Sequence, residues 1–293
     1  MIGQSNILQA VERMARASKQ TATRPKNLAF EASRGMGKTL MMQEVARMLE
    51  LTPIETAFKR GTHMDKAVNV LRYQWRPSSC WIIDELHNAS IPNQMALKKL
   101  VESGIYVTNI GDTITIPNLV VVAAFTDRSL IDPEFLDRFT VYRLVPYSFE
   151  ERLEILFSYA KAQGIEISYD DAEMIVCSND SPRSIVKAMH SAFIIHTLGE
   201  PVTHQSIFAE QQKDSDGLDY VDRQMLVTIA DLLGSQVKAT LDVLSDKVRL
   251  STKATNNLLS RLSSMGFVKT TPGLGRTLTD LGWQKVDAIR AEN

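Results

Sequence analysis

The chain has 293 residues, of which 44% are apolar and 23% are charged, and its formal net charge is −1. This length is sufficient for two or three small domains, and the composition is that of an ordinary soluble globular protein. With two cysteines, no apolar run of about 18 residues and no apolar segment of a signal peptide in residues 1–20, the sequence argues against a disulfide framework, a membrane span and secretion. We therefore expect an intracellular protein.

The first predicted elements place a glycine-rich loop between a strand and a helix. Apolar residues at helical spacing follow Ser5 and predict a helix there. Residues 27–32, "NLAFEA", predict a buried strand, and residues 39–51 predict a second helix. The loop between them reads "ASRGMGKT" at residues 32–39. Strand, glycine loop and helix form the context in which phosphate loops occur.

This loop departs from the phosphate-loop pattern G-x-x-x-x-G-K-[ST] at its first position, where Ala32 replaces glycine. Such a loop aims backbone N–H groups at phosphate oxygens, at a helix N-terminus whose dipole favours anions. Alanine is unfavourable there only if φ must be positive, so the sequence still predicts nucleotide binding. The residues expected to bind the nucleotide are Gly35, Met36, Gly37, Lys38, Thr39 and Leu40.

A second strand, within residues 77–90, ends in two carboxylates. Four apolar residues precede Asp84 and Glu85, as in a Walker B strand. In that pattern Asp84, together with the hydroxyl of Thr39, holds Mg²⁺, and Glu85 polarises the attacking water. A solvated acidic turn is the simpler alternative, but the phosphate loop favours the catalytic interpretation. The two motifs together predict ATP and Mg²⁺ as cofactors and ATP hydrolysis as the activity.

The remaining pattern predicts an α/β sheet followed by helices. Residues 93–104 predict a helix, residues 104–118 a hairpin around an Ile-Gly-Asp turn, and residues 118–127 a central parallel strand. Strands that alternate with helices indicate a parallel sheet with ligands at the carboxyl ends of its strands. After Pro146, three helices are expected, then a polar linker at residues 209–217.

The C-terminal residues predict helix, helix, helix and two short strands around "TPGLGR", which is the order of a winged helix-turn-helix. The expected domains are a nucleotide-binding domain at 1–147, a helical lid at 148–208 and a winged helix at 209–293.

Several motifs together resemble the AAA+ ATPases. They are "IGQ" at residues 2–4, "GMGKT", "IIDELH", "AAFTDRSLIDPEFLDRF" and "SPRSIVKAMHSAF", and they occur in the AAA+ order. "GLDYVDRQML" and "GFVKTTPGLGR" resemble the winged helix of the RuvB family, the Holliday-junction branch-migration motors. The resemblance covers nearly the whole chain. It implies an α/β AAA+ P-loop core with a parallel sheet, a small helical lid domain and a C-terminal winged helix.

The resemblance also implies roles for particular residues. Thr126 matches sensor 1, Arg138 in "LDRF" matches the arginine finger that reaches a neighbouring subunit's γ-phosphate, and Arg183 in "SPR" matches sensor 2 in the lid. Ile2 and Gly3 fall where the adenine is held. Thr126 has a simpler alternative as a strand-end threonine, Arg138 as a salt-bridge residue and Arg183 as a surface residue. A finger supplied in trans implies a homo-oligomer, typically a hexamer.

The winged helix is the predicted DNA contact. Ser251 is a favourable helix N-cap, and Leu258, Leu259, Leu262 and Met265 form an apolar stripe that predicts core. Lys253, Asn256, Asn257 and Arg261 lie on other faces of that helix, and Arg276 is expected at the tip of the wing. Lys238, Lys247, Arg249 and Lys269 add positive charge. Contacts of this kind to phosphates give affinity without sequence preference. Use of the same surface for protein contact is the alternative.

The leading hypothesis is an ATP-driven motor that translocates duplex DNA and promotes Holliday-junction branch migration as a ring. One alternative is an AAA+ helicase loader or transposition-type ATPase that forms filaments on DNA; another is a DNA-binding protein that holds a nucleotide with little turnover. The hairpin at 104–118 is shorter than in RuvB, where it holds the partner RuvA, so a RuvA-like adaptor, a different adaptor and none remain open. The resemblance places the protein in a bacterial cytoplasm or a phage-infected host.

Overall fold

The computed structural model describes residues 1–59 and 61–292, which form two compact units, Met1–Tyr147 and Ser148–Asn293. In the described parts of the chain, no helix is long and apolar enough to span a bilayer. The division into three domains stays a prediction, and two separate apolar cores within the second unit support it.

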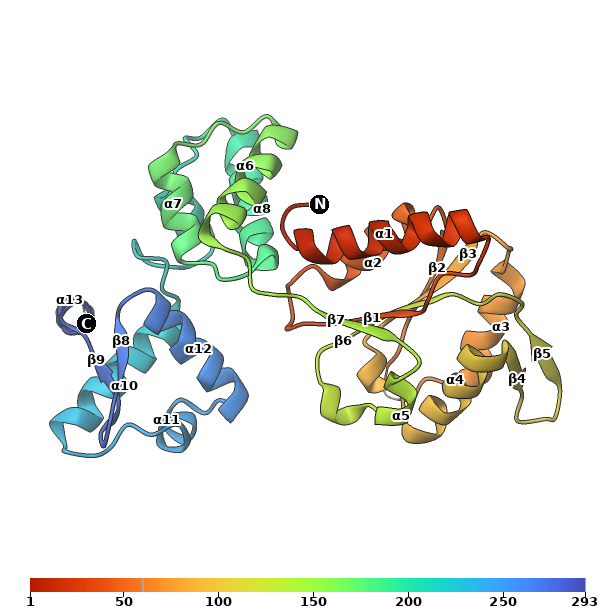
Figure 1. Ribbon diagram of the computed structural model, residues 1–293. Coiled ribbons are helices and arrows are strands. Elements are labelled where there is room, and N and C mark those ends of the chain that lie inside the picture. Colours follow the sequence, from red (N-terminus) through yellow and green to blue (C-terminus); the bar gives the residue numbers. More distant parts are fainter. Residues whose placement is uncertain (60, 293) are drawn as a thin grey trace. The chain divides into compact units, whose positions relative to one another are not determined.

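The first unit is built on a five-stranded parallel sheet in the order β2-β3-β6-β1-β7 (Figure 1). The strands are β1 (Leu28–Glu31), β2 (Thr52–Ala57), β3 (Ser79–Asp84), β6 (Val121–Phe125) and β7 (Thr140–Arg143). The central strands are apolar on both faces because helices cover both faces, as in other parallel sheets. Strand β6 separates β1 from β3.

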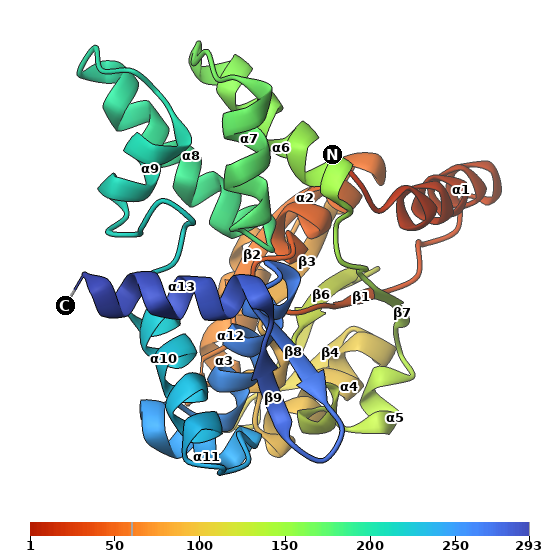
Figure 2. The same ribbon diagram turned by 90° about the vertical axis from the view of Figure 1, so that its left-hand side faces the viewer.

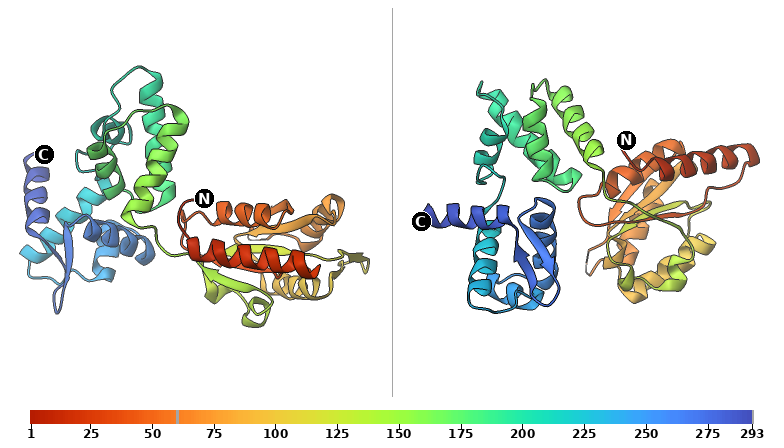
Figure 3. Two further views of the ribbon diagram at one scale, coloured as in Figure 1. Left: turned by 45° about the horizontal axis from the view of Figure 1, so that its top comes forward. Right: turned by 60° about the vertical axis from the view of Figure 1, so that its left-hand side comes forward.

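Helices α1 and α2 cover one face of this sheet, and α3, α4 and α5 cover the other (Figures 1 and 3). Their bounds are α1 (Ser5–Thr21), α2 (Lys38–Met48), α3 (Met64–Gln74), α4 (Ile91–Ser103) and α5 (Pro133–Leu136), with short 3₁₀ helices η1 (Leu86–Asn88) and η2 (Arg128–Leu130). Aliphatic side chains and fully buried aromatic ones, among them Trp81 and Phe125, form an apolar core in this unit. Strands β2 and β7 and helices α3 and α5 were not specified by the sequence pattern.

The predicted hairpin is present as β4 (Ile105–Val107) and β5 (Thr113–Thr115), which pair antiparallel next to α4. Gly104 ends α4 with a positive φ of 70°, and a Cβ there would lie 2.6 Å from the carbonyl oxygen of Ile116. Only glycine therefore permits this turn from helix into hairpin. Ile110 at the tip is 85% exposed.

The second unit begins with four helices where the sequence predicts three. They are α6 (Phe149–Gln163), α7 (Tyr169–Cys177), α8 (Pro182–Thr197) and α9 (His204–Glu210), drawn in green to teal in Figure 3. The extra helix, α9, is short, and it begins at a capping box in which the side chain of Thr203 accepts from the backbone of Ser206. It forms because Ile207 and Phe208 are buried in the core of this helical group, a contact that a seven-residue polar pattern does not reveal.

The rest of the second unit is a winged helix (Figure 2). Its elements are α10 (Tyr220–Gly234), α11 (Leu241–Val248), α12 (Thr252–Ser264), β8 (Val268–Thr271), β9 (Gly275–Leu278) and α13 (Asp280–Ala291). The predicted order is confirmed up to β9, and α13 is an addition. Its start packs closely on the wing, because a Cβ at Gly282 would lie 2.2 Å from the carbonyl oxygen of Phe267.

Candidate functional site

The phosphate loop has the backbone shape that anion binding needs. Gly35 and Gly37 adopt positive φ angles of 84° and 79°, and Gly37 is the N-cap of α2. The first turn of α2 contains no acidic residue. Its backbone N–H groups and its dipole therefore favour a negatively charged group at this end.

Ala32 fits the loop without strain. It does not adopt a positive φ, it is buried, and its N–H donates to the carbonyl oxygen of Phe125 (3.2 Å), which extends the pairing of β1 with β6. The methyl group therefore takes the place of the usual glycine at no conformational cost. The ammonium group of Lys38 curls back over the loop and donates to the carbonyl oxygens of Ala32 (3.0 Å) and Ser33 (3.2 Å).

Thr39 and Asp84 meet at the carboxyl edge of the sheet. The hydroxyl of Thr39 donates to Oδ2 of Asp84 (2.9 Å), while Oδ1 of Asp84 accepts from the backbone N–H of Glu85 (2.8 Å). Magnesium at a phosphate site is typically bound by one or two protein oxygens together with phosphate and water. A hydroxyl and a carboxylate at this distance next to the phosphate loop fit that requirement.

Glu85 and Thr126 lie on either side of a residue that the sequence analysis did not select, His87. Nε2 of His87 lies 3.2 Å from a carboxylate oxygen of Glu85 and 3.3 Å from the hydroxyl of Thr126. The strand ends of β3 and β6 are neighbours, which brings these two residues together. The only available signal was the histidine in "DELH", directly after the acidic pair.

A small hollow of about 170 Å³ opens beside the phosphate loop. Its lining combines loop residues with strand ends, namely Glu31, Ala32, Ser33, Met36, Thr126, Arg143, Leu144 and Pro146. Arg143 is exposed at the carboxyl end of β7 and adds a cation that sequence reasoning missed. The register explains its position, because Arg143 is the partner of Glu31, the last residue of β1.

The N-terminal segment is clamped to the end of the first unit by Gln4. Its side chain donates to the carbonyl oxygen of Val145 (2.7 Å) and accepts from the N–H of Val145 (3.1 Å). Gly3 and Gln4 both adopt positive φ. This paired contact fixes the backbone of the predicted adenine-binding residues, Ile2 and Gly3, against residues that follow β7.

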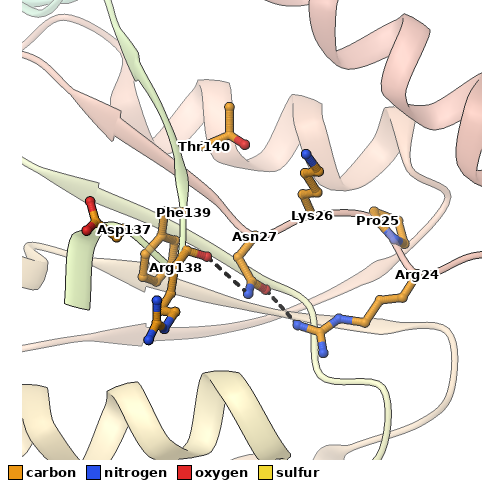
Figure 4. Close-up of a pocket in the computed structure, with 8 residues that line it drawn as sticks. All are labelled: Arg24, Pro25, Lys26, Asn27, Asp137, Arg138, Phe139 and Thr140. Atoms are coloured by element: carbon orange, nitrogen blue, oxygen red, sulfur yellow. Dashed lines mark hydrogen bonds between the residues drawn. The ribbon is translucent and has the colours of Figure 1, made fainter. Parts of the chain in front are cut away.

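Arg138 lies at the opposite, amino edge of the sheet (Figure 4). It comes two residues before Thr140, which begins β7 and pairs with Leu28 at the start of β1. Its guanidinium forms an ion pair with Glu102 in which both side chains are about two-fifths exposed. A surface pair of this kind stabilises by about 0–1 kcal/mol, so Arg138 can leave it at little cost.

Arg138 lines a polar hollow of about 420 Å³ together with Arg24 and Lys26. The amide of Asn27 organises this hollow: Oδ1 accepts from Arg24 (2.9 Å) and Nδ2 donates to the carbonyl oxygen of Arg138 (3.5 Å) (Figure 4). Partial burial lowers the pKa of Arg24 from its usual high value. The hollow beside the predicted finger is thus lined by three cations and by the carboxylate of Asp137.

Arg183 belongs to the second unit, where it is exposed in the first turn of α8. The helix begins at a capping box between Ser181 and Ser184, with Pro182 in its first turn. This N-terminus fixes the backbone of Arg183 and leaves its side chain in solvent.

Two of the predicted DNA contacts require correction. Arg276 is not at the tip of the wing: it lies within β9 opposite Thr270, to whose hydroxyl its guanidinium donates. The tip is formed by Pro272, Gly273 and Leu274. The glycine-rich stretch misled the prediction because Gly275 belongs to the strand, where a Cβ would lie 2.5 Å from the carbonyl oxygen of Ala239.

Arg261 forms an ion pair within the domain and does not project freely into solvent. Its guanidinium, 19% exposed, pairs with Asp222 of α10, whose side chain is fully buried. Burial raises the pKa of Asp222, and Arg261 acts against that rise. We therefore do not retain Arg261 among the candidate DNA contacts.

The remaining candidates are exposed cations on several elements of the winged helix. Ser251 caps α12 as predicted, with its hydroxyl accepting from the N–H of Ala254 (3.3 Å), and Lys253 is exposed in the first turn of that helix. The buried stripe consists of Leu259 and Leu262, with Leu258 and Met265 only partly buried beside them. The other exposed cations of the winged helix are Lys238, Lys247, Arg249 and Lys269.

The sheet order, the phosphate loop on β1, the acidic end of β3 and the polar end of β6 define a P-loop nucleotide-binding protein of the AAA+ class. No protein-family model matches the chain.

Similarity to RuvB proteins extends over almost the whole chain. It is 25% identical over 299 residues to the Holliday junction branch migration complex subunit RuvB of Wolbachia sp. subsp. Brugia malayi, covering 96% of this chain and 89% of that protein. For the RuvB of Enterococcus faecalis the identity is 25% over 300 residues, with coverage of 96% and 87%. The structure of the RuvB Holliday junction branch migration motor of Thermotoga maritima superposes with a TM-score of 0.73 at 21% identity, covering 98% of this chain and 95% of that one. The chain is a divergent RuvB-like AAA+ protein.

Proposed function

We propose that this protein is an ATP-driven DNA motor that translocates duplex DNA and promotes Holliday-junction branch migration. The observation that carries the proposal is the constellation of Thr39, Asp84 and Glu85 beside an unstrained phosphate loop, on the same chain as a winged helix with exposed cations. The curated relatives named as branch-migration subunits support the same reading.

ATP and Mg²⁺ are the proposed cofactors. The phosphate loop from Gly35 to Leu40 would hold the phosphates, and Lys38 would exchange its two carbonyl contacts for phosphate oxygens. Thr39 and Asp84 would hold the metal, with Ile2 and Gly3 at the adenine. Bound Mg²⁺·ATP supplies the phosphoryl group and the charge neutralisation of its transfer.

The chain's own residues perform the rest of the reaction. Glu85 orients and polarises the attacking water, since its carboxylate follows directly on the metal-binding Asp84. Thr126 fixes the position of that water from the neighbouring strand. Arg183 of the lid supplies positive charge to the phosphates, which matters because the transition state carries its charge on peripheral oxygens.

Arg138 is proposed to act on the nucleotide of a neighbouring subunit. Its position at the amino edge of the sheet places the four residues of β7, at about 3.3 Å each, between it and the edge that carries the phosphate loop. An arginine at that distance cannot serve its own site without unfolding the strand. The proposal therefore includes a homo-oligomer, and a hexameric ring is its expected form.

The cations of the winged helix are proposed to bind DNA through phosphates, with Lys253 on α12 and Arg276 on β9 as contacts. Contacts to phosphate alone carry no base information, which suits a protein that must move along DNA. The exposed hairpin β4–β5, with Ile110 at its tip, is the surface that we assign to an adaptor of the RuvA kind.

The test of the function is separation of a labelled four-way DNA junction. Wild-type protein with Mg²⁺ and ATP is expected to convert the junction into duplex arms, and Lys38→Ala is expected to abolish this conversion because it removes the ammonium group that would contact the phosphates. Native gels of junction and product provide the measurement, with and without a RuvA protein.

Junction binding with ATP turnover but no strand separation would contradict the motor and identify a loader. Electron microscopy of the same samples distinguishes closed rings from open filaments.

The wing prediction concerns salt dependence. Arg276→Ala and Lys253→Ala are each expected to weaken duplex binding and to lower the slope of log K against log salt by about one, as for one lost phosphate contact. Titrations at several salt concentrations measure this slope. Lys161→Ala, an exposed lysine on α6 of the same unit, is the matched control. Unchanged affinity at every salt concentration would remove the wing from the DNA interface.

A further inference from the structure

His87 joins two parts of the proposed active site that come from different strands. Its imidazole is 13% exposed and lies between the carboxylate of Glu85, at the end of β3, and Thr126, at the end of β6. Two ring nitrogens make three contacts there: Nε2 with Glu85 (3.2 Å), Nε2 with the hydroxyl of Thr126 (3.3 Å), and Nδ1 with the backbone N–H of Thr126 (3.4 Å).

The backbone under the ring is fixed by neighbours on both sides. His87 is the middle residue of η1, where Leu86 is fully buried in the core and the side chain of Asn88 donates to the carbonyl oxygen of Phe58 (3.2 Å). Glu85 begins this turn with a positive φ of 54°. A non-glycine residue in that region costs energy and persists only where its surroundings impose it.

The contacts select one form of the ring. The N–H of Thr126 can only donate, so Nδ1 accepts from it and carries no proton. The proton is then on Nε2, where it faces an acceptor oxygen of Glu85 and the hydroxyl of Thr126. A neutral ring with Nε2–H satisfies all three contacts, while a ring protonated on Nδ1 would set two donors against each other.

We propose that His87 is a positioning residue that orients the carboxylate of Glu85 and couples it to Thr126. The inference rests on the proposed ATPase function, in which Glu85 polarises the water. The neutral Nε2–H donor orients one carboxylate oxygen and leaves the other free to accept from water. Because the same ring accepts from the backbone of Thr126, a shift of β6 is transmitted to Glu85 through His87.

ATPase kinetics of single and double variants test this role. His87→Ala is expected to lower kcat by about ten- to hundredfold, the range for a displaced catalytic group, and to leave KM and ATP-analogue affinity within about twofold. His87→Gln, whose amide can still donate toward Glu85, is expected to recover part of kcat. In a Glu85→Gln background, His87→Ala is expected to add less than about twofold. His63→Ala, an exposed histidine before α3, is the matched control.

The tautomer gives a measurement independent of activity. Long-range ¹H–¹⁵N spectra of the histidine rings are expected to show His87 fixed with its proton on Nε2. A ring that exchanges between tautomers, or carries its proton on Nδ1, would overturn the proposal.

The kinetic outcomes distinguish the proposed role of His87 from the proposed ATPase function on which it rests. An active wild type whose His87→Ala variant keeps its kcat, or loses kcat and nucleotide affinity together, refutes the positioning role and leaves the ATPase intact. A wild-type protein without ATPase activity, alone or with DNA, removes both.

Discussion

The Glu85→Gln variant is expected to bind ATP with wild-type affinity and to hydrolyse it at least about hundredfold more slowly, because an amide cannot polarise water. The rate of ATP hydrolysis by Arg138→Ala is expected to fall by about 10³-fold or more, which is the effect of an absent arginine finger. An equal mixture of the two inactive variants is expected to regain part of the activity. In the mixture, some interfaces combine an intact Glu85 from one subunit with an intact Arg138 from the other.

Steady-state phosphate release measures this recovery, and energy transfer between labelled subunits shows that the variants have mixed. Double-substituted protein, carrying both changes on each chain, is the matched control, because its mixtures contain no complete interface. Mixed oligomers without any recovery would place the finger in its own subunit or outside the reaction. Wild-type turnover by Glu85→Gln would instead show that Glu85 is not the catalytic carboxylate.

The second large expected effect is on the free energy of unfolding of the winged helix. Arg261→Ala is expected to destabilise the winged helix by about 3–5 kcal/mol, because it leaves the fully buried carboxylate of Asp222 without its cation. Native-state hydrogen exchange measures this locally, and the amides of α10 and α12 are expected to lose protection by at least about hundredfold. Arg223→Ala, on α10 next to Asp222, is the matched control: its pair with Glu292 is more exposed and is expected to contribute about 0–1 kcal/mol.

The stability that Arg261→Ala loses should depend on pH in a defined direction. Burial raises the pKa of Asp222, and removing Arg261 removes the main charge that opposes this rise. A carboxyl with a raised pKa in the folded state stabilises the fold below its unfolded pKa, about 3.9, and this contribution disappears as pH increases through the folded value. Arg261→Ala is therefore expected to be closest to wild type in acid and to fall behind toward neutral pH. A deficit that is the same at both pH values would contradict the buried-charge explanation.

The ion pair between Arg261 and Asp222 also explains why the sequence suggested a DNA contact for Arg261. The spacing on α12 puts Arg261 outside the apolar stripe, and an arginine on a recognition helix is a reasonable DNA contact. Its partner, Asp222, is 39 residues earlier on another helix. Pairing over such a separation depends on how α10 and α12 pack, which no local pattern encodes.

The sequence by itself indicated the chemistry and the order of the elements that carry it. The phosphate loop, the acidic strand end and the polar end of β6 are local patterns, because strand, loop and helix follow one another in the chain and each carries its own functional residue. The glycines at 35 and 37 have the positive φ that the pattern requires, and Ala32 does not need one. The order of helices and strands in the winged helix could be predicted for the same reason, because helical and strand periodicity are properties of short segments.

The tertiary structure alone decided which of these residues meet. The parallel register of β3 with β6 sets His87 between Glu85 and Thr126, and the register of β1 with β7 puts Arg143 at the carboxyl edge and Arg138 at the amino edge. The same holds for α9, which is stable only on the core of its neighbours, and for Arg276, whose strand begins where Gly275 meets Ala239. In each case the deciding interaction joins residues distant in sequence, and its free energy exists only once the chain is packed.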